Sequence, residues 1–185
     1  MIKYDCDYYY NLLKFHSGSA KMICDVRWNF IKENLENGDN ILNALDYGCG
    51  VGFMKVFAPE WLDTENIDTY DIISIPQTGI RSQRYSIVML YDVLEHIPDF
   101  TDVLPVLNKT NYVAVTVPIK PVKMKWADYK HFKPGEHLHY FTVDLLRHIF
   151  WVMGFEMIAS GTPECPPREH VSSFLFKRYE KCLEQ

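Results

Sequence analysis

The sequence has no long apolar run, few cysteines and no excess of positive charge. Its longest apolar stretch, Tyr85–Tyr91, is interrupted by Ser86 and is far too short to cross a bilayer. The 5 cysteines are odd in number and show no close pairing, which favours reduced thiols and a cytoplasmic protein. The net charge of −5 argues against a broad surface for nucleic acid. We therefore expect one soluble domain spanning residues 1–185, with no membrane partner.

Short apolar segments alternate with helical patterns over most of the chain. The predicted strands are Ile41–Asp46, Ile67–Ile73, Tyr85–Tyr91, Tyr112–Val117, Phe155–Ser160 and Ser173–Lys177. The predicted helices are Met22–Leu35, Phe53–Phe57, Phe100–Leu107 and a segment between the N-cap candidate Thr142 and the stop residue Gly154. This alternation predicts an α/β fold with a Rossmann-like doubly wound, mostly parallel sheet and an antiparallel C-terminal edge hairpin. Residues 1–38 are expected to form an N-terminal helical extension packed on it, through Ile23, Val26, Phe30 and Ile31.

Glycine is scarce, with 9 residues in the chain, yet Gly48, Gly50 and Gly52 stand together directly after the first predicted strand. Glycines at such a point allow a tight turn and let a ligand lie against bare backbone. A phosphate-binding loop would end in Gly-Lys-Ser/Thr, and a dinucleotide fingerprint would have glycine where Phe53 stands. The turn begins with an acid, Asp46, which repels phosphate but accepts hydrogen bonds from an ammonium group.

A second acid, Asp71, follows the core of the second predicted strand. A carboxylate there can accept hydrogen bonds from both hydroxyl groups of a ribose. Together with the glycine turn and Asp46, it predicts a nucleoside ligand that carries an amino acid, a description that S-adenosylmethionine fits. The simpler interpretation, in which the glycines only turn the chain, stays open.

The segment Asp46–Gly52 resembles the first motif, D-x-G-x-G-x-G, of the class I S-adenosylmethionine-dependent methyltransferases, and Asp71 resembles their second-strand acid. Two later segments, Tyr91–Ile97 and Glu136–Thr142, are similar to the ubiquinone-biosynthesis-like branch of that family. The similarity spans roughly residues 40–177, and the opening of the chain is further similar to small methyltransferase-like proteins of phages and marine viruses. It implies S-adenosylmethionine as the cofactor, held by Asp46, Tyr47, Gly48, Gly50, Gly52, Phe53, Asp71, Tyr91 and Asp92.

The chain departs from this family between Asp71 and Tyr85, where too few residues remain for a helix and a third strand. We therefore expect a sheet that is shortened after its second strand. Family members usually place an adenine-contacting acid in this region, and the candidates here are Gln77, Ser82 and Gln83. Cofactor affinity is the property that this departure affects.

Methyl transfer needs an aligned nucleophile and, for many acceptors, a group that removes its proton. An imidazole titrates near neutral pH, and His137 lies in a loop after the fourth predicted strand, where substrates approach a doubly wound sheet. We predict His137 as the proton acceptor and His96 as the second candidate. The aromatic faces of Tyr47, Phe53 and Tyr91 would stabilise the sulfonium.

A metal site is a further interpretation of the histidines. His137 and His139 alternate, so on an extended segment they would face the same side and, with His131, resemble a ligand set. No cysteine or carboxylate cluster accompanies them beyond Glu136 and Asp128. We therefore expect no bound metal.

The leading functional hypothesis is an enzyme that transfers a methyl group from S-adenosylmethionine to a small-molecule or glycan-type acceptor. The alternative is a degenerate methyltransferase fold that acts as a non-catalytic binding module, which the shortened region after Asp71 favours. A nicotinamide-dependent oxidoreductase is disfavoured by Phe53 and Asp46. Nucleic-acid methylation is disfavoured because the segment after the third predicted strand lacks an Asn/Asp-Pro-Pro-Tyr tetrad. A homodimer is the protein assembly that the sequence leaves open.

Overall fold

The structure is a computed structural model that describes residues 6–72, 80 and 83–179, with side chains described from residue 19 onward. Helices α1 (Cys6–Asn34), α2 (Phe53–Val56), α3 (Leu104–Leu107) and α4 (Val143–Val152) alternate with strands β1 (Ala44–Tyr47), β2 (Ile67–Tyr70), β3 (Tyr85–Tyr91), β4 (Thr110–Pro118), β5 (Phe155–Gly161) and β6 (Val171–Arg178). Short 3-10 helices lie at Thr64–Asn66, Phe100–Asp102 and Trp126–Asp128. Within the described ranges, no helix is both long and apolar enough to span a membrane.

The described strands form one sheet in the order β2-β1-β3-β4-β6-β5. The pairs β1–β2, β1–β3 and β3–β4 are parallel, whereas β6 runs antiparallel to both β4 and β5. The order reverses direction at β1, and β2 is an edge strand of the described sheet. The predicted doubly wound, mostly parallel α/β fold with an antiparallel C-terminal hairpin is therefore confirmed. The predicted shortening after the second strand concerns a segment of which residues 73–79 and 81–82 lie outside the described residues.

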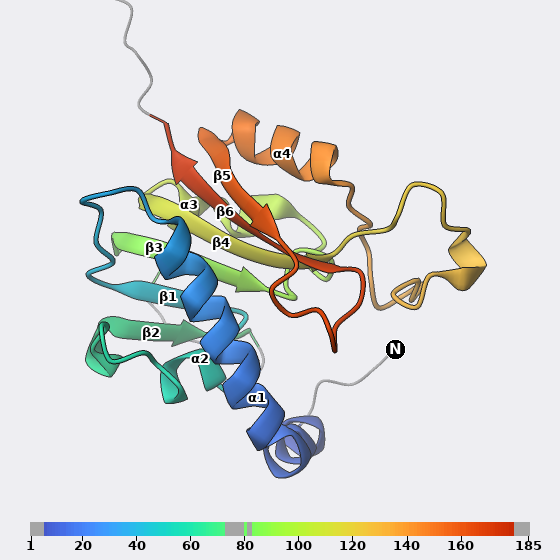
Figure 1. Ribbon diagram of the computed structural model, residues 1–185, viewed down its shortest axis with the longest axis horizontal. Helices are drawn as coiled ribbons and strands as arrows, with labels where there is room; N and C mark the ends of the chain where they lie inside the picture. The colour runs from blue at the N-terminus through green and yellow to red at the C-terminus, as the bar shows by residue number, and fades with distance from the viewer. Residues whose placement is uncertain (1–5, 73–79, 81–82, 180–185) are drawn as a thin grey trace, which may run out of the picture.

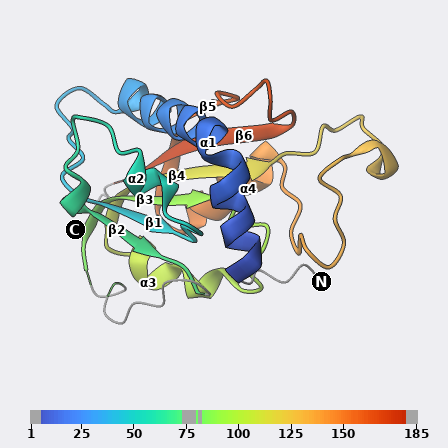
Figure 2. The ribbon, with the colours of Figure 1, turned by 90° about the horizontal axis from the view of Figure 1, so that it is seen from below.

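Two helical layers cover the sheet (Figures 1 and 2). Helices α1 and α2 lie on one face, and α3 and α4 lie on the other. Strand β3 is buried on both sides because alternate residues point to opposite faces. Ile87 and Met89 pack in the core beneath α1 and α2, while Val88 and Leu90 pack in the core beneath α3 and α4. The sequence prediction for β3 matches its observed bounds.

Helix α1 is longer than predicted and buries a different face. Its most buried described residues are Ala20, Cys24, Trp28 and Ile31. Of the predicted stripe, Ile31 is buried, whereas Ile23, Val26 and Phe30 are partly exposed. Trp28 explains the rotation, because its indole N–H donates a hydrogen bond of 3.2 Å to the carbonyl oxygen of Met54 in α2. A buried tryptophan with a satisfied N–H outweighs the smaller side chains of the predicted stripe.

The helix predicted at Phe100–Leu107 is interrupted. It forms the 3-10 turn Phe100–Asp102 and then the short helix α3, with Pro105 in its first turn, where a missing N–H costs nothing. Helix α4 agrees with its prediction, since the Thr142 hydroxyl accepts a hydrogen bond of 3.2 Å from the amide of Leu145. The predicted stop, Gly154, has a φ of 89° just beyond that helix.

The first strand is shorter than predicted at its start, because Ile41–Asn43 lie outside β1. Asn43 instead bridges to the neighbouring strand, where its side-chain oxygen accepts a hydrogen bond of 2.8 Å from the amide of Ser86. A β-bridge between Ile119 and Phe141 joins the two ends of the loop that follows β4. This loop projects to the right in Figure 1. This loop carries the predicted catalytic residue His137.

Candidate functional site

A sharp turn joins β1 to α2. Gly48, Gly50 and Gly52 adopt φ values of 78°, 56° and 77°, in the left-handed region that other residues rarely enter. A Cβ atom on Gly48 would lie 2.5 Å from Cγ2 of Val93, which is closer than real atoms approach. Both the backbone conformation and the packing therefore require glycine at this position.

The turn is tied to the end of β2. The amides of Gly48 and Cys49 donate to the carbonyl oxygen of Tyr70 at 2.7 and 3.0 Å. The amide of Gly50 donates to the carboxylate of Asp71 at 3.0 Å. A carboxylate oxygen has capacity for more than one hydrogen bond. The same acid that fixes the turn can therefore also serve a ligand beside it.

Two neighbouring cavities open at this turn. The larger, of about 590 Å³, is lined by residues that include Tyr47, Gly48, Gly50, Phe53, Asp71, Tyr91, Asp92, Glu95, His96 and His137. The smaller, of about 320 Å³, shares Gly48, Phe53, Tyr91 and Asp92 and adds Arg27 and Asp46. Among the predicted cofactor residues, Gly52, the N-cap of α2, lines neither cavity. The structure thus brings together the other eight and both predicted catalytic histidines.

Asp46 is buried at the end of β1, with 3% of its surface exposed. Burial raises the pKa of its carboxyl group to about 7, with a further increase from Asp71, while Arg27 acts in the opposite direction. A buried acid of this kind gains stability from a cation placed beside it. Asp46 lines the smaller cavity, so a ligand ammonium group there would provide that charge.

Four charged residues form a network beside Asp46 that the sequence analysis missed. Arg27 donates to Glu164 at 2.7 Å and to Asp92 at 2.9 Å, and Arg168 donates to the same two acids at 2.6 and 2.7 Å. Burial opposes ionisation of Asp92, but the charges of Arg168 and Arg27 outweigh it and lower the Asp92 pKa to about 2. The predicted cofactor residue Asp92 is therefore an ionised member of this network.

One sequence signal could have revealed this network. Arg27 follows Cys24 by three residues and precedes Ile31 by four, so it falls on the buried side of α1. A charged residue among core positions of a helix indicates a buried partner. No comparable signal marks Glu164 and Arg168, which reach the site from the loop between β5 and β6.

The three predicted aromatic residues all line the larger cavity. The guanidinium carbon of Arg27 lies 4.4 Å from the ring centroid of Tyr91, so one face of this ring already makes a cation–π contact. Tyr47 packs against Tyr70 with ring centroids 4.7 Å apart. Phe53, at the start of α2, lies in the wall of both cavities. Tyr47 and Phe53 are the better placed of the three to contact a sulfonium.

The two predicted catalytic histidines meet, although they lie in separate loops. The rings of His96 and His137 are 4.8 Å apart at an angle of 82°. Burial lowers the pKa of His137, and the nearby His96 and Lys133 lower it further. The sequence analysis missed a third member, Glu95, whose ligand oxygen lies within 4.8 Å of the imidazole nitrogens. Burial and the charge of Asp92 raise the Glu95 pKa to about 8.

The metal interpretation considered His131, His137 and His139 together, and the structure does not bring these three side chains together as a ligand set. His139 donates from Nε2 to the carbonyl oxygen of Ile97 at 2.9 Å, and His131 donates from Nε2 to the carbonyl oxygen of Glu169 at 3.0 Å. These bonds direct both rings to backbone carbonyl oxygens, and neither histidine belongs to the group of potential ligands that contains His137. The adenine candidates Gln77 and Ser82 lie outside the described residues, and Gln83 accepts a hydrogen bond of 3.2 Å from the hydroxyl of Tyr85.

A family comparison identifies the domain. Residues 20–160 match the model of a methyltransferase domain. The chain belongs to this methyltransferase-domain family. The match spans the glycine turn, Asp71 and the histidines, so the family resemblance seen in the motifs is confirmed at this level. A search of curated proteins gives no match.

Solved methyltransferases share the fold at low sequence identity. An S-adenosylmethionine-dependent methyltransferase from Clostridium acetobutylicum has a TM-score of 0.61 and 10% identity, over 94% of this chain and 98% of the other. The magnesium protoporphyrin IX methyltransferase of Synechocystis, solved with bound SAH, has a TM-score of 0.57 and 18% identity, over 86% and 83%. The 16S rRNA methylase ArmA has a TM-score of 0.53 and 14% identity, over 92% and 91%. Such identities show a common fold, and they leave the acceptor of this methyltransferase domain to be argued from its site.

Proposed function

We propose that this protein transfers a methyl group from S-adenosylmethionine to a small-molecule or glycan-type acceptor. One observation carries the proposal: a single cavity is lined both by the glycine turn with Asp71 and by the pair His96 and His137. The first set suits a nucleoside, and the second suits a nucleophile that must lose a proton. In-line methyl transfer requires these two components side by side.

The cofactor is assigned from the charges of the site. Asp71 would accept hydrogen bonds from the ribose hydroxyl groups. The methionine tail of S-adenosylmethionine carries an ammonium and a carboxylate, and the smaller cavity offers both Asp46 and the guanidinium groups of Arg27 and Arg168. The solved Synechocystis neighbour, which holds SAH, supports this choice of cofactor.

The reaction itself needs little covalent help from the protein. The acceptor atom forms a bond to the methyl carbon while the carbon–sulfur bond breaks, so the sulfonium becomes a neutral thioether and the acceptor loses its proton. His137 is the predicted proton acceptor, with His96 second. Because burial lowers the pKa of His137, its ring is neutral and able to accept a proton near neutral pH.

The choice of acceptor class rests on the net charge of the chain and on its sequence similarity. The net charge of −5 favours a small or glycan-type acceptor over nucleic acid. The similarity of Tyr91–Ile97 and Glu136–Thr142 to the ubiquinone-biosynthesis-like branch supports the same choice. We assign the reaction to the cytoplasm on the basis of the free cysteines among the described side chains, Cys24, Cys49 and Cys165. Because ArmA is an rRNA methylase, RNA is the competing acceptor to test.

Isothermal titration with S-adenosylmethionine and its demethylated product tests the cofactor assignment. We expect saturable binding of both, and Asp71→Ala should weaken it by about 2–4 kcal/mol through the loss of charge-assisted hydrogen bonds. Asp71→Asn tests whether the turn alone is sufficient, because an amide oxygen can still accept the Gly50 hydrogen bond. Asp144→Asn, an exposed position on α4, is the matched control and should bind as the wild type does.

Absence of binding by both compounds at millimolar concentration would contradict the proposal and favour the non-catalytic binding module. With binding established, transfer of a labelled methyl group is measured against small-molecule extracts, glycans and total RNA. Label in RNA alone would overturn the acceptor class and leave the cofactor assignment intact.

A further inference from the structure

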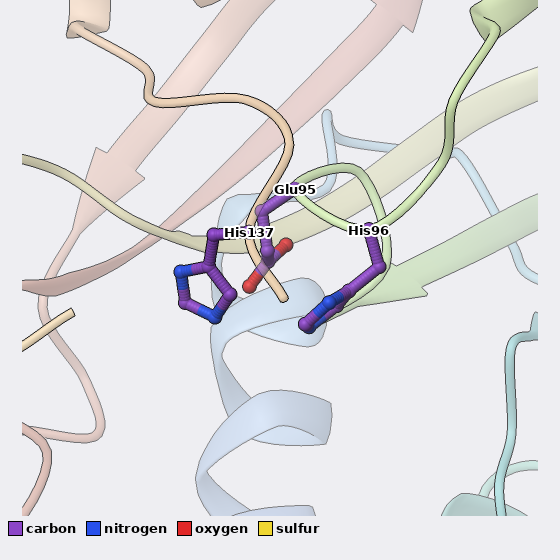
Figure 3. Close-up of side chains that lie close together, drawn as sticks. All are labelled: Glu95, His96 and His137. Atoms are coloured by element: carbon purple, nitrogen blue, oxygen red, sulfur yellow. The ribbon is translucent and has the colours of Figure 1, made fainter. Parts of the chain in front are cut away.

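Three potential ligands converge from two loops (Figure 3). Glu95 and His96 follow β3, and His137 comes from the loop that precedes α4. One ligand atom from each lies within 4.8 Å of the other two. Figure 3 shows the Glu95 carboxylate between the two imidazole rings. All three residues line the larger cavity, so the space between them is continuous with the proposed acceptor site.

Glu95 supplies an independent sign that something is bound there. Only 2% of this residue is exposed, and its Oε2 atom has no hydrogen-bond partner in the described part of the chain. A buried acceptor without a partner destabilises the fold, because no protein hydrogen bond replaces its lost hydration. Its nearest suitable neighbours are two imidazole rings, so a cation held among the three would satisfy the orphaned oxygen.

One of the two imidazole rings is held in a fixed orientation by a hydrogen bond. The Nδ1–H of His96 donates to the carbonyl oxygen of Glu136 at 3.0 Å, and this bond fixes the orientation of the ring. The His137 ring packs edge-on against that of His96, with ring centroids 4.8 Å apart. Metal-binding histidines characteristically donate their second ring N–H to a carbonyl or carboxylate, because that bond fixes both tautomer and orientation.

The two loops are also fastened to each other. The amides of Leu138 and His139 donate to the carbonyl oxygen of Glu95 at 2.7 and 3.3 Å. Together with the bond from His96 to Glu136, these contacts hold the three ligands in place without a metal. A site held in this way loses little conformational entropy when an ion enters.

We propose that Glu95, His96 and His137 bind one divalent first-row transition-metal ion. Two imidazoles and one carboxylate favour zinc, cobalt, iron or manganese, whereas magnesium and calcium prefer all-oxygen sites. Ligands at zinc-like distances lie about 3.4 Å apart in a tetrahedron, so the observed 4.8 Å spread needs a contraction of the order of 1 Å. Three protein ligands leave coordination positions open toward the cavity, as in catalytic sites.

This inference deepens the proposed function and, for its catalytic consequence, rests on it. An acceptor hydroxyl coordinated at an open position would have its pKa lowered, and its oxygen would be held toward the methyl group. The proton would pass to solvent as the oxygen–carbon bond forms and the carbon–sulfur bond breaks. His137 would then act through the ion, because a coordinated imidazole has no second lone pair for a proton.

Metal binding is measured on EDTA-treated protein without S-adenosylmethionine. Co²⁺ is titrated by visible absorption and Zn²⁺ by calorimetry. We expect one ion per chain and cobalt bands of a nitrogen–oxygen site, without thiolate charge transfer. Glu95→Gln and His137→Ala should each weaken binding at least ~100-fold, the upper end of what outer-shell changes cost. His148→Ala, at an exposed position on α4, is the matched histidine control and should not change the affinity.

Thermal unfolding separates a ligand from a structural residue. Without metal, Glu95→Gln should melt close to the temperature of the wild type, because it keeps the size and shape of the buried side chain. With Zn²⁺ present, the wild type should gain thermal stability and the variant should not. A purely structural Glu95 would give the same response to Zn²⁺ in both proteins, which overturns the proposal.

Several results count against the site. These are a wild type that shows no saturable Co²⁺ binding, variants that bind as tightly as the wild type, or a preference for Mg²⁺ over Zn²⁺. The two proposals fail differently. A cobalt spectrum without any binding of S-adenosylmethionine would contradict only the proposed methyl transfer. Binding of S-adenosylmethionine without a cobalt site would contradict only the proposed metal site.

Discussion

Two groups of residues line the larger cavity, and they are built in different ways. The cofactor group, centred on Gly48, Gly50 and Asp71, comes from one β-turn-α unit and the end of the adjacent strand. The histidine group, Glu95, His96 and His137, joins two loops that lie 40 residues apart at the bond between His96 and Glu136. The cofactor group depends on backbone conformation, whereas the histidine group depends on side chains that tertiary packing brings together.

The two groups also differ in what they leave unsatisfied. In the cofactor group, the amides of Gly48, Cys49 and Gly50 donate to Tyr70 and Asp71 within the protein. In the histidine group, the buried Oε2 of Glu95 has no partner among the described residues. A turn can thus be complete in the folded chain, while a cluster of ligand side chains is completed by what it binds. Three predictions test this difference.

The largest effect is expected at the cofactor group. Gly48→Ala places a Cβ 2.5 Å from Cγ2 of Val93 and forces a side chain into a φ of 78°. Left-handed strain and overpacking together should lower the free energy of unfolding by about 2–5 kcal/mol. Urea denaturation measures the loss, and binding of S-adenosylmethionine should disappear in parallel.

Gly38→Ala is the matched control, since Gly38 has a φ of 93° but no atom within 4 Å of an added Cβ. It should lose only the strain component, about 1–2 kcal/mol. Adding Val93→Ala to the Gly48→Ala variant should restore part of its stability. Equal losses for the two glycine variants would show that close packing against Val93 contributes nothing to the turn.

The second effect concerns the buried acid of the cofactor group. The pKa of Asp46 rises from 3.8 in an ordinary carboxyl to about 7 in the fold. Below pH 4 the carboxyl is protonated in both states and carries no penalty. As the pH rises toward 7, the unfolded chain ionises first, so stability falls, by as much as about 4 kcal/mol, and stays low above pH 7.

Comparison with Asp46→Asn isolates this contribution. Asp46 interacts electrostatically with charged and titratable groups from several elements. They are Arg27 and Cys24 of α1, Cys49 of the turn, Asp71 after β2 and Tyr91 of β3. Denaturation between pH 4 and 8 should show that the free energy of unfolding of the variant, relative to that of the wild type, increases up to about pH 7. A constant difference across that range would mean that Asp46 is ionised throughout.

The smallest effect is expected in the support of the histidine group. His139 donates to the carbonyl oxygen of Ile97 at 2.9 Å and packs against Phe100 with ring centroids 4.8 Å apart. His139→Phe keeps an aromatic ring and removes the hydrogen bond, so stability should fall by about 1 kcal/mol. Zn²⁺ affinity should fall by roughly 10-fold, because the loop that carries His137 is held less firmly.

That prediction has a direct counter-outcome. Unchanged Zn²⁺ affinity in His139→Phe, together with the expected loss of stability, would show that the loop contact stabilises the fold without positioning a ligand. The exposed His148→Ala variant again provides the histidine control in the same calorimetric measurement.

Much of the fold was predictable because its signals are local. The apolar run Tyr85–Tyr91 indicated β3, and Thr142 with Gly154 indicated the limits of α4. The face of α1 was not predictable in the same way. Its orientation depends on Trp28 reaching the carbonyl of Met54, a partner that lies 26 residues away. Local periodicity identifies a helix, but long-range packing decides which side is buried.

The sequence by itself determined the glycine turn, because backbone conformation at Gly48 and Gly50 restricts residue type directly. It also marked Asp46 before the turn and Asp71 after the adjacent strand. The tertiary structure alone decided which side chains share the cavity. It left His131 and His139 outside the group of potential ligands that contains His137, added Glu95, and linked Arg27 to two acids in distant loops. The reason is physical: each of these contacts depends on chain segments that meet only after the sheet has formed, and no local pattern encodes that meeting.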